Sequence, residues 1–173
     1  MRLDNHAIDV FLQPGDFFVA DEGYRIRTVL GSCVSITLWH PASRTGGMSH
    51  FLLPTRCQAE VDPVLDGRYG DEALRLMLAE LRQWGVAPAQ CQGKIFGGGD
   101  MFPGHARAAS LSVGQRNGLA ARALLSEQGV AIVAQSLFGV GHRQIIFDIR
   151  SGDVWSNQVR PGDQELETEE MLR

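Results

Sequence analysis

Cysteine is scarce in this 173-residue sequence, and no two cysteines form a Cys-x-x-Cys pair. The three cysteines are Cys33, Cys57 and Cys91. An odd number of cysteines without a signal peptide argues against a disulfide framework and favours reduced thiols in the cytoplasm. Free cysteine most often packs as a small core hydrophobe, so we expect Cys57 and Cys91 to be buried.

Long apolar runs are also absent. No stretch approaches the roughly 20 apolar residues that a helix needs to cross a bilayer. The first 18 residues include Asp4, Asp9, Pro14 and Asp16, and they lack the continuous apolar segment of a signal peptide. We therefore expect a cytoplasmic protein without membrane insertion.

A basic excess is missing too, because the formal net charge is −4. Binding of a nucleic-acid polyanion calls for a basic surface, so nucleic acid is not expected as the main partner. The sequence is 44% hydrophobic and 21% charged, which is enough for one core, and the chain is short for two domains. We predict one domain over residues 1–160 and an acidic C-terminal tail over 161–173. The tail is expected to be a solvated end, with a partner-binding helix as the alternative.

The pattern of apolar residues predicts strands and two main helices. Strands are expected at 24–30 and 34–39, as neighbours joined by the Gly31-Ser32 turn, and at 51–53, 94–96, 130–135, 144–149 and 153–159. Helical spacing of apolar residues covers 71–84, with Asp71 as its N-cap and Gly85 at its end. A second helix runs from a Ser112 cap to about Gln128, and Gly129 ends it.

These elements define a fold class. Their order is strands, helix, strand, helix, strands, and no regular βαβ repeat is present. We predict an α/β fold, a single-domain layered sandwich in which a mixed, largely antiparallel β-sheet packs with two main helices.

Cys33 is the strongest functional candidate in the chain. It follows Gly31 and Ser32, where the chain can turn sharply, and precedes the alternating segment 34–38, which predicts a half-buried strand. A cysteine at such a turn can be exposed and rigidly held. Since the thiolate is the attacking form of the side chain, Cys33 also needs a nearby base.

His50 is the candidate base. It closes the segment Gly46-Gly47-Met48-Ser49-His50 and lies just before the apolar run 51–53, so we expect it on or beside a strand. An imidazole can take the thiol proton and stabilise the resulting charge. The sequence predicts that Cys33 and His50 face each other across adjacent strands, and His142 is the main rival for the role of base.

Other polar groups give weaker signals. The spacings of the five histidines, His6, His40, His50, His105 and His142, match no common metal-ligand pattern, so no metal or cofactor is expected. The glycine run 97–99 lacks the ending of a P-loop and is interpreted as a tight backbone wall beside the site. Four arginines are candidates for contact with acidic partner surfaces: Arg68, Arg107, Arg116 and Arg143.

Six short segments occur in a characteristic order along the chain: 30–34 (Leu-Gly-Ser-Cys-Val), 46–54 (Gly-Gly-Met-Ser-His-Phe-Leu-Leu-Pro), 68–71 (Arg-Tyr-Gly-Asp), 94–98 (Lys-Ile-Phe-Gly-Gly), 114–117 (Gly-Gln-Arg-Asn) and 146–148 (Ile-Phe-Asp). In these segments the sequence resembles the CheD family of bacterial chemoreceptor glutamine deamidases, over roughly residues 8–160. The segment 139–143 departs from the family pattern.

The resemblance implies an activity and a set of site residues. It implies hydrolysis of receptor glutamine side chains to glutamate by the Cys33–His50 pair through a thioester, in chemotaxis adaptation, without a cofactor. Thr28 is implied as a third site residue, with Arg27 in the adjacent position. Backbone N–H groups near Gly31 and Ser32 are candidates for the oxyanion hole.

The implied partners are the cytoplasmic helices of a chemoreceptor and, as a second partner, the CheC phosphatase. Hydrolysis of glutamyl methyl esters would follow the same acyl chemistry. The alternative function is a non-catalytic or weakly catalytic adaptation module that binds the receptor or CheC. A metal-dependent enzyme is a third, weaker alternative.

Overall fold

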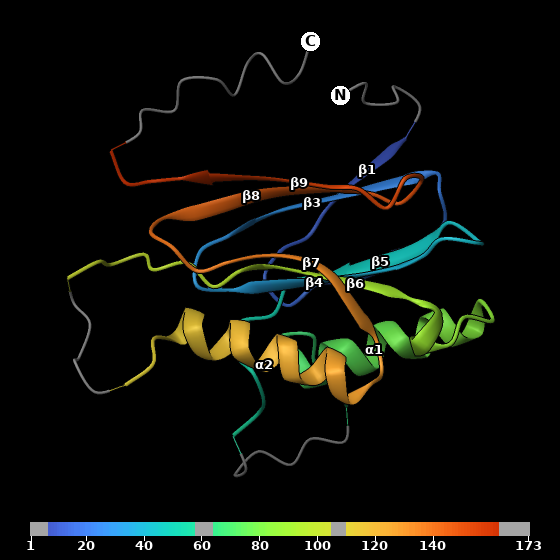
Figure 1. The fold of residues 1–173 in the computed structure, drawn as a ribbon, viewed down its shortest axis with the longest axis horizontal. Coiled ribbons are helices and arrows are strands. Elements are labelled where there is room, and N and C mark those ends of the chain that lie inside the picture. The colour runs from blue at the N-terminus through green and yellow to red at the C-terminus, as the bar shows by residue number, and fades with distance from the viewer. Residues whose placement is uncertain (1–6, 58–63, 105–109, 163–173) are drawn as a thin grey trace.

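The computed structural model describes residues 7–57, 64–104 and 110–162, and these residues form three layers (Figure 1). The outer sheet has the strand order β1-β3-β8-β9, and the middle sheet has the order β2-β5-β4-β6-β7. Two helices cover the free face of the middle sheet (Figure 1). The elements are β1 (Ile8–Phe11), β2 (Phe17–Ala20), β3 (Tyr24–Leu30), β4 (Val34–His40), β5 (Thr45–Ser49), α1 (Gly70–Gln83), a 3-10 turn (Pro88–Gln90), β6 (Gln92–Gly97), α2 (Val113–Glu127), β7 (Ala131–Leu137), β8 (His142–Asp148) and β9 (Val154–Val159).

The predicted fold class is confirmed, and its sheet is divided in two. Five of the seven strand pairs are antiparallel, whereas β1 pairs with β3 and β6 pairs with β7 in parallel. The acidic tail lies almost entirely outside the described residues, so the predicted boundary near residue 160 stays a prediction. None of the helices in the described part of the chain is long and apolar enough to span a membrane.

The pairing predicted for the strands at 24–30 and 34–39 is wrong. Both strands exist, but β3 belongs to the outer sheet and β4 to the middle sheet. The Gly31–Cys33 turn carries the chain from one sheet to the other. Its carbonyls at Gly31 and Cys33 accept hydrogen bonds from the N–H groups of Gly99 and Gly98, so the glycine run, and not a hairpin partner, holds this turn.

Three strands were not predicted from the sequence. β1 and β2 have four residues each, and β5 has five, two of which are glycines, so none of them gives a clear alternating pattern. The segment 51–53, predicted as a strand, forms only isolated bridges from Phe51 and Leu53. His50 therefore does lie beside a strand, but that strand precedes it.

The two helices match their predicted ranges closely. Ser112 caps α2 as predicted, because its hydroxyl accepts a hydrogen bond from the N–H of Gln115. The N-cap of α1 is Tyr69, and Asp71 lies in the first helical turn, so the predicted cap is wrong. Gly85 and Gly129 follow the two helices with φ angles of +77° and +70°, the left-handed conformation expected at a helix end.

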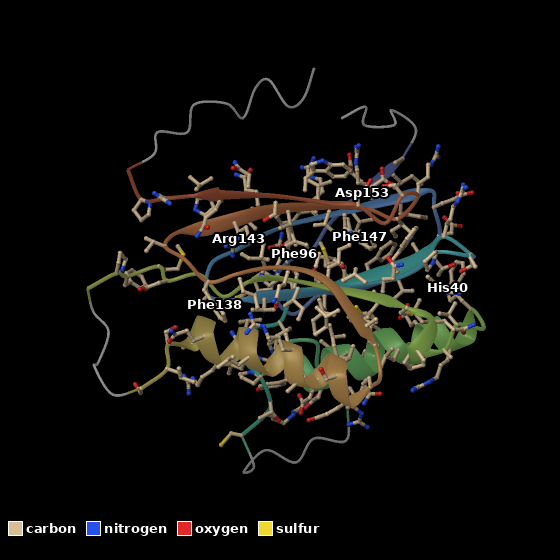
Figure 2. The ribbon with its side chains drawn as sticks, in the orientation of Figure 1. His40, Phe96, Phe138, Arg143, Phe147 and Asp153 are labelled. Carbon is tan, nitrogen blue, oxygen red and sulfur yellow. The ribbon has the colours of Figure 1, made fainter. Side chains whose placement is uncertain are left out.

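Two apolar cores separate the three layers. The helix-side core, between the middle sheet and the helices, includes Val34, Ile36, Leu38, Phe51, Leu74, Met77, Leu78, Leu81, Ile95, Ala121 and Leu125. The inter-sheet core includes Leu12, Ile26, Leu30, Met48, Phe96, Ile145 and Phe147. Figure 2 shows Phe96, Phe147 and Arg143 between the two sheets.

Cys57 and Cys91, both predicted to be buried, differ in their exposure. Cys91 is buried in the helix-side core as predicted. Cys57 is exposed, so its predicted burial is wrong. It follows the segment Pro54-Thr55-Arg56 in a loop, outside any strand or helix that would turn it toward a core.

Candidate active site

Cys33 and His50 lie on the same face of the middle sheet. Val34 and Phe51 form an antiparallel bridge that continues the β4–β5 register, which places Cys33 opposite Leu52 and His50 diagonally across from Cys33. Residues at such diagonal positions are about 7–8 Å apart, and their Cβ atoms are somewhat closer. Cys33 packs against the inter-sheet core, so both side chains face the outer sheet.

The imidazole of His50 is held from the opposite sheet. Thr28 lies on β3 of the outer sheet, and its Oγ1 is 2.8 Å from Nδ1 of His50 and 2.8 Å from the carbonyl oxygen of Leu12. The carbonyl of Leu12 can only accept, so it takes the single hydroxyl proton of Thr28. Nδ1 of His50 must then donate to Thr28, and Nε2 is left unprotonated, with a lone pair that can accept a proton.

Backbone contacts fix the segment around His50. The N–H of His50 donates to the carbonyl of Asp16, and the carbonyl of His50 accepts from the N–H of Gly15. Phe51 then exchanges two hydrogen bonds with Val34, which directly follows the nucleophile candidate. His50 is 3% exposed, so its ring has little freedom to turn away from Thr28.

Burial shifts both titrating groups toward their neutral forms. Burial lowers the pKa of His50, while the carbonyl of Leu12 and the charge of Asp16 act in the opposite direction. Burial also raises the pKa of the half-buried Cys33 thiol, and the N–H of Cys33 itself partly offsets this rise. No hydrogen bond joins Cys33 to His50 among the described residues. Both shifts favour a neutral thiol and a neutral imidazole in the resting site.

The backbone at Cys33 has available donors. Within the described residues, no acceptor is found for the N–H of Ser32, and the N–H of Cys33 interacts only with the sulfur of its own side chain. The carbonyl oxygens on this turn are occupied, by Gly99 at Gly31, by Asn117 at Ser32 and by Gly98 at Cys33. A turn with bound carbonyls and available N–H groups can accept a negatively charged oxygen beside the sulfur.

The glycine run forms a backbone wall at this turn. Gly97 and Gly98 have φ angles of +115° and +66°, which a side chain would strain. A Cβ added to Gly97 would collide with the carbonyl oxygen of Cys33. On Gly31, an added Cβ would lie 3.1 Å from the sulfur of Met101, so Met101 closes the other side of the turn.

Arg143 is buried, which overturns its interpretation as a surface contact. It is 3% exposed, and its guanidinium donates to the carbonyls of Gly97 and Phe138 and to the side chain of Gln158. Figure 2 shows Arg143 between the sheets. The cation binds backbone carbonyls of the glycine wall and is not available to an acidic partner.

The remaining candidates lie elsewhere. His142 precedes Arg143 on β8, and since successive strand residues alternate, it faces away from the inter-sheet core. Arg68 and Arg116 are exposed, and Arg68 pairs with Asp66 at 2.6 Å. Arg107 lies outside the described residues. Among the described residues, no group of three or more His, Cys, Asp or Glu side chains could hold a metal ion.

Asn117 is a residue near the site to which the sequence analysis gave no role. It lies on α2 and is completely buried, and its Nδ2 donates to the carbonyls of Ser32 at 3.0 Å and of Leu52 at 2.8 Å. The available signal was a polar residue on the inner face of a predicted helix, three and four residues from Gly114 and Ala121. Its periodicity alone could not say what it binds.

The fold and the site together define a class: a single α/β unit in which a thiol and an imidazole lie between two sheets at the point where the chain crosses from one to the other. A family model described as CheD chemotactic sensory transduction matches residues 52–158. The chain belongs to the CheD family. Cys33 and His50 precede the matched segment, and the longer alignments with individual relatives extend over most of the chain.

Several curated proteins are similar over most of their length. The chain is 67% identical over 161 residues to the probable chemoreceptor glutamine deamidase CheD 2 of Albidiferax ferrireducens, covering 93% of each chain. It is 41% identical to the probable chemoreceptor glutamine deamidase CheD 3 of Dechloromonas aromatica, covering 91% of this chain and 92% of that one. The resemblance inferred from the six segments is confirmed.

Solved structures give a weaker likeness. YlmD from Geobacillus stearothermophilus matches with a TM-score of 0.44 and 17% identity over 72% of this chain and 51% of that chain. YfiH from Bacillus licheniformis matches with a TM-score of 0.40 and 14% identity over 73% of this chain and 50% of that chain. The chain thus spans about half the length of these two structures.

Proposed function

We propose that this protein is a chemoreceptor glutamine deamidase in which Cys33 is the nucleophile and His50 is the base. The observation that carries the proposal is the hydrogen bond from Nδ1 of His50 to Thr28, which leaves Nε2 free on the face that Cys33 shares. The names of the curated relatives support the choice of substrate.

The reaction is hydrolysis of a primary amide through a thioester. Nε2 of His50 takes the thiol proton as Sγ of Cys33 attacks the amide carbon of the glutamine side chain. His50 then gives this proton to the departing nitrogen, and ammonia leaves. A water molecule, deprotonated by His50, attacks the thioester and releases glutamate and the thiol. The balance is glutamine plus water giving glutamate plus ammonia.

The tetrahedral intermediates carry a negative charge on oxygen. We assign the N–H groups of Ser32 and Cys33 as its donors, supported by Gly31, which lets Met101 pack directly over the turn. Thr28 acts through His50: it fixes the tautomer and keeps the ring in one orientation.

The neutral resting pair implies that proton transfer accompanies attack. Burial favours both the protonated thiol and the unprotonated imidazole, so no ion pair is stored before the substrate binds. Hydrogen bonds between a catalytic nucleophile and its base often form or tighten only when the substrate is in place. A buried thiol that stays protonated until then is also protected from oxidation.

The proposed substrates are glutamine side chains on the cytoplasmic helices of a chemoreceptor, and the protein would act in the cytoplasm. Each conversion replaces a neutral side chain with a carboxylate and so changes helix–helix electrostatics in the receptor. Glutamyl methyl esters would react by the same steps with methanol as the leaving group. CheC remains a proposed second partner.

The test is mass spectrometry of a recombinant receptor fragment before and after incubation with the protein. A gain of about 1 Da per converted glutamine, with matching ammonia release, is the expected result for this acyl-transfer chemistry. Cys33→Ala should abolish both signals and keep the circular dichroism spectrum. Cys57→Ser, which changes an exposed cysteine, should retain both and serves as the matched control.

A binding module without catalysis is the second candidate. The burial-raised pKa of Cys33 is the observation that favours it, because a protonated thiol is a poor nucleophile. The same experiment separates the two functions. A receptor fragment that binds the wild-type protein without a change in mass would support the binding module and reject the deamidase.

A further inference from the structure

The face of α2 that approaches the candidate site consists of two glycines and an asparagine. Gly114, Asn117 and Gly118 lie three and four residues apart on α2, so they share one face of the helix, and all three are buried. A Cβ added to Gly114 would collide with the carbonyl oxygen of Gly98, and one added to Gly118 would lie 2.7 Å from the ring of Phe138. The helix backbone therefore lies directly against the glycine wall.

This close approach brings the amide of Asn117 to the two segments of the site. One N–H of its Nδ2 reaches the carbonyl of Ser32, the peptide that ends at Cys33. The other reaches the carbonyl of Leu52, two residues after His50. Both donors of a single nitrogen are thus used to link the segment that carries the thiol to the segment that carries the imidazole.

The oxygen of the same amide accepts no hydrogen bond among the described residues. This oxygen, Oδ1 of Asn117, is buried. An unpaired buried oxygen opposes folding, and an apolar side chain of similar size would not carry that cost. Packing of the core alone therefore does not explain Asn117. Its contribution is the two hydrogen bonds that it donates.

From this geometry, and resting on the proposed deamidase function, we infer that Asn117 is a positioning residue for the reaction. It has two effects. It sets the separation of the thiol and the imidazole by holding both segments to one atom. It also polarises the Ser32–Cys33 peptide through its carbonyl, which makes the N–H of Cys33 a stronger donor to the oxyanion.

The first test compares Asn117→Ala with Leu125→Ala. Leu125 lies two turns further along α2, is completely buried in the helix-side core and packs beside Gly93 on β6, so its truncation is a matched control for loss of stability. Both variants are assayed for deamidation of the receptor fragment, at a temperature where circular dichroism shows each to be folded.

The expected result is a difference in kcat. Asn117→Ala should lower kcat roughly 10- to 100-fold, as small misplacements of reacting groups do, with KM within about threefold of the wild-type value. Leu125→Ala should change kcat less than about threefold, since distant sites act independently. Equal losses of kcat in the two variants, or a loss confined to KM, would overturn the inference.

A second variant, Asn117→Asp, adds a pH signature. A protonated carboxyl can donate one hydrogen bond to one of the two carbonyls, whereas an ionised carboxylate can donate none and is repelled by both. The ratio of variant to wild-type kcat should therefore be highest at low pH and fall as pH rises through the pKa of the introduced carboxyl. A ratio that does not change with pH would contradict the positioning role.

A third variant covers the case in which neither substitution folds. Gly118→Ala keeps Asn117 but pushes α2 away from the ring of Phe138, and we expect it to lower kcat by about threefold to tenfold. An unchanged kcat in this variant would then overturn the inference. A wild-type protein that converts no glutamine would instead reject the proposed function, so the two failures are distinguishable.

Discussion

The two cores of the molecule lie on opposite faces of the same middle sheet and differ in composition. On its helix side, α1 and α2 cover a mainly apolar core, and the buried amide of Asn117 on α2 bonds to the two segments of the candidate site. On its other side, the inter-sheet core is apolar at its centre, but Thr28, His50 and Arg143 are buried there as well, each in hydrogen bonds. We expect the helix-side core to supply mainly stability, and the inter-sheet core, together with the first half of α2, to serve the proposed reaction.

The two helices also differ in the composition of their buried faces. The buried face of α1 is mainly aliphatic, with Ala73, Leu74, Met77, Leu78 and Leu81. The buried face of α2 begins with Gly114, Asn117 and Gly118 and becomes aliphatic only toward Leu125. The first half of α2 thus belongs to the candidate site, whereas α1 belongs to the core alone.

Leu78→Ala should produce the largest effect on stability. Leu78 is 2% exposed in the helix-side core, and truncation of such a side chain costs about 2–5 kcal/mol in the free energy of unfolding. Deamidation per folded molecule should not change. Chemical denaturation and the receptor-fragment assay measure the two quantities, and a fall in kcat beyond the loss of folded protein would break the division between the layers.

Thr28→Val should have the opposite profile. It keeps the shape of the side chain but removes the acceptor of Nδ1 of His50, so the imidazole loses its fixed tautomer, and kcat should fall roughly 10- to 100-fold. The melting temperature should change less than in Leu78→Ala.

Thr37→Val is the matched control for this substitution, because Thr37 is also a buried threonine in the inter-sheet layer, opposite Met48. Its kcat should stay close to that of the wild type. Comparable losses in Thr28→Val and Thr37→Val would mean that any change in this layer impairs the enzyme.

The pH dependence of kcat/KM should show the smallest effect. The base must be unprotonated to act, and burial lowers the pKa of His50 below its ordinary value of 6.5. The unprotonated imidazole therefore persists to lower pH, and the acidic fall in kcat/KM should have its midpoint below pH 6.5. A midpoint at or above that value would mean that the ring is more solvated than the structure indicates.

The sequence predicted the parts of the fold that depend on local pattern. Both helices follow from apolar spacing, and the strands β3, β4, β8 and β9 follow from alternation and turn residues. The relation of β3 to β4 was missed because a short turn with glycine is typical of a hairpin. Here the carbonyls of the turn bond to Gly98 and Gly99, which lie far along the chain and give no local signal.

The candidate site was likewise predicted only in part from the sequence. Cys33 and His50 were predicted as a pair, and the structure places them on one face, although their catalytic roles stay predictions. The contact of Thr28 with His50 joins two sheets and could not be predicted from spacing; the resemblance to the CheD family implied Thr28 as a site residue but not its partner. Arg143 and Cys57 were assigned the wrong burial, because burial depends on which segments pack around a residue and not on its neighbours in sequence.

The hydrogen bond between Thr28 and His50 makes the tautomer of the imidazole depend on the distance between the two sheets. One partner stands on each sheet, so a local opening of this end of the sandwich breaks the bond before either core is exposed. The proton on Nδ1 would then be free to move to Nε2 and remove the lone pair that takes the thiol proton. If His50 acts as proposed, activity would therefore be lost at a smaller opening of the sandwich than unfolding requires.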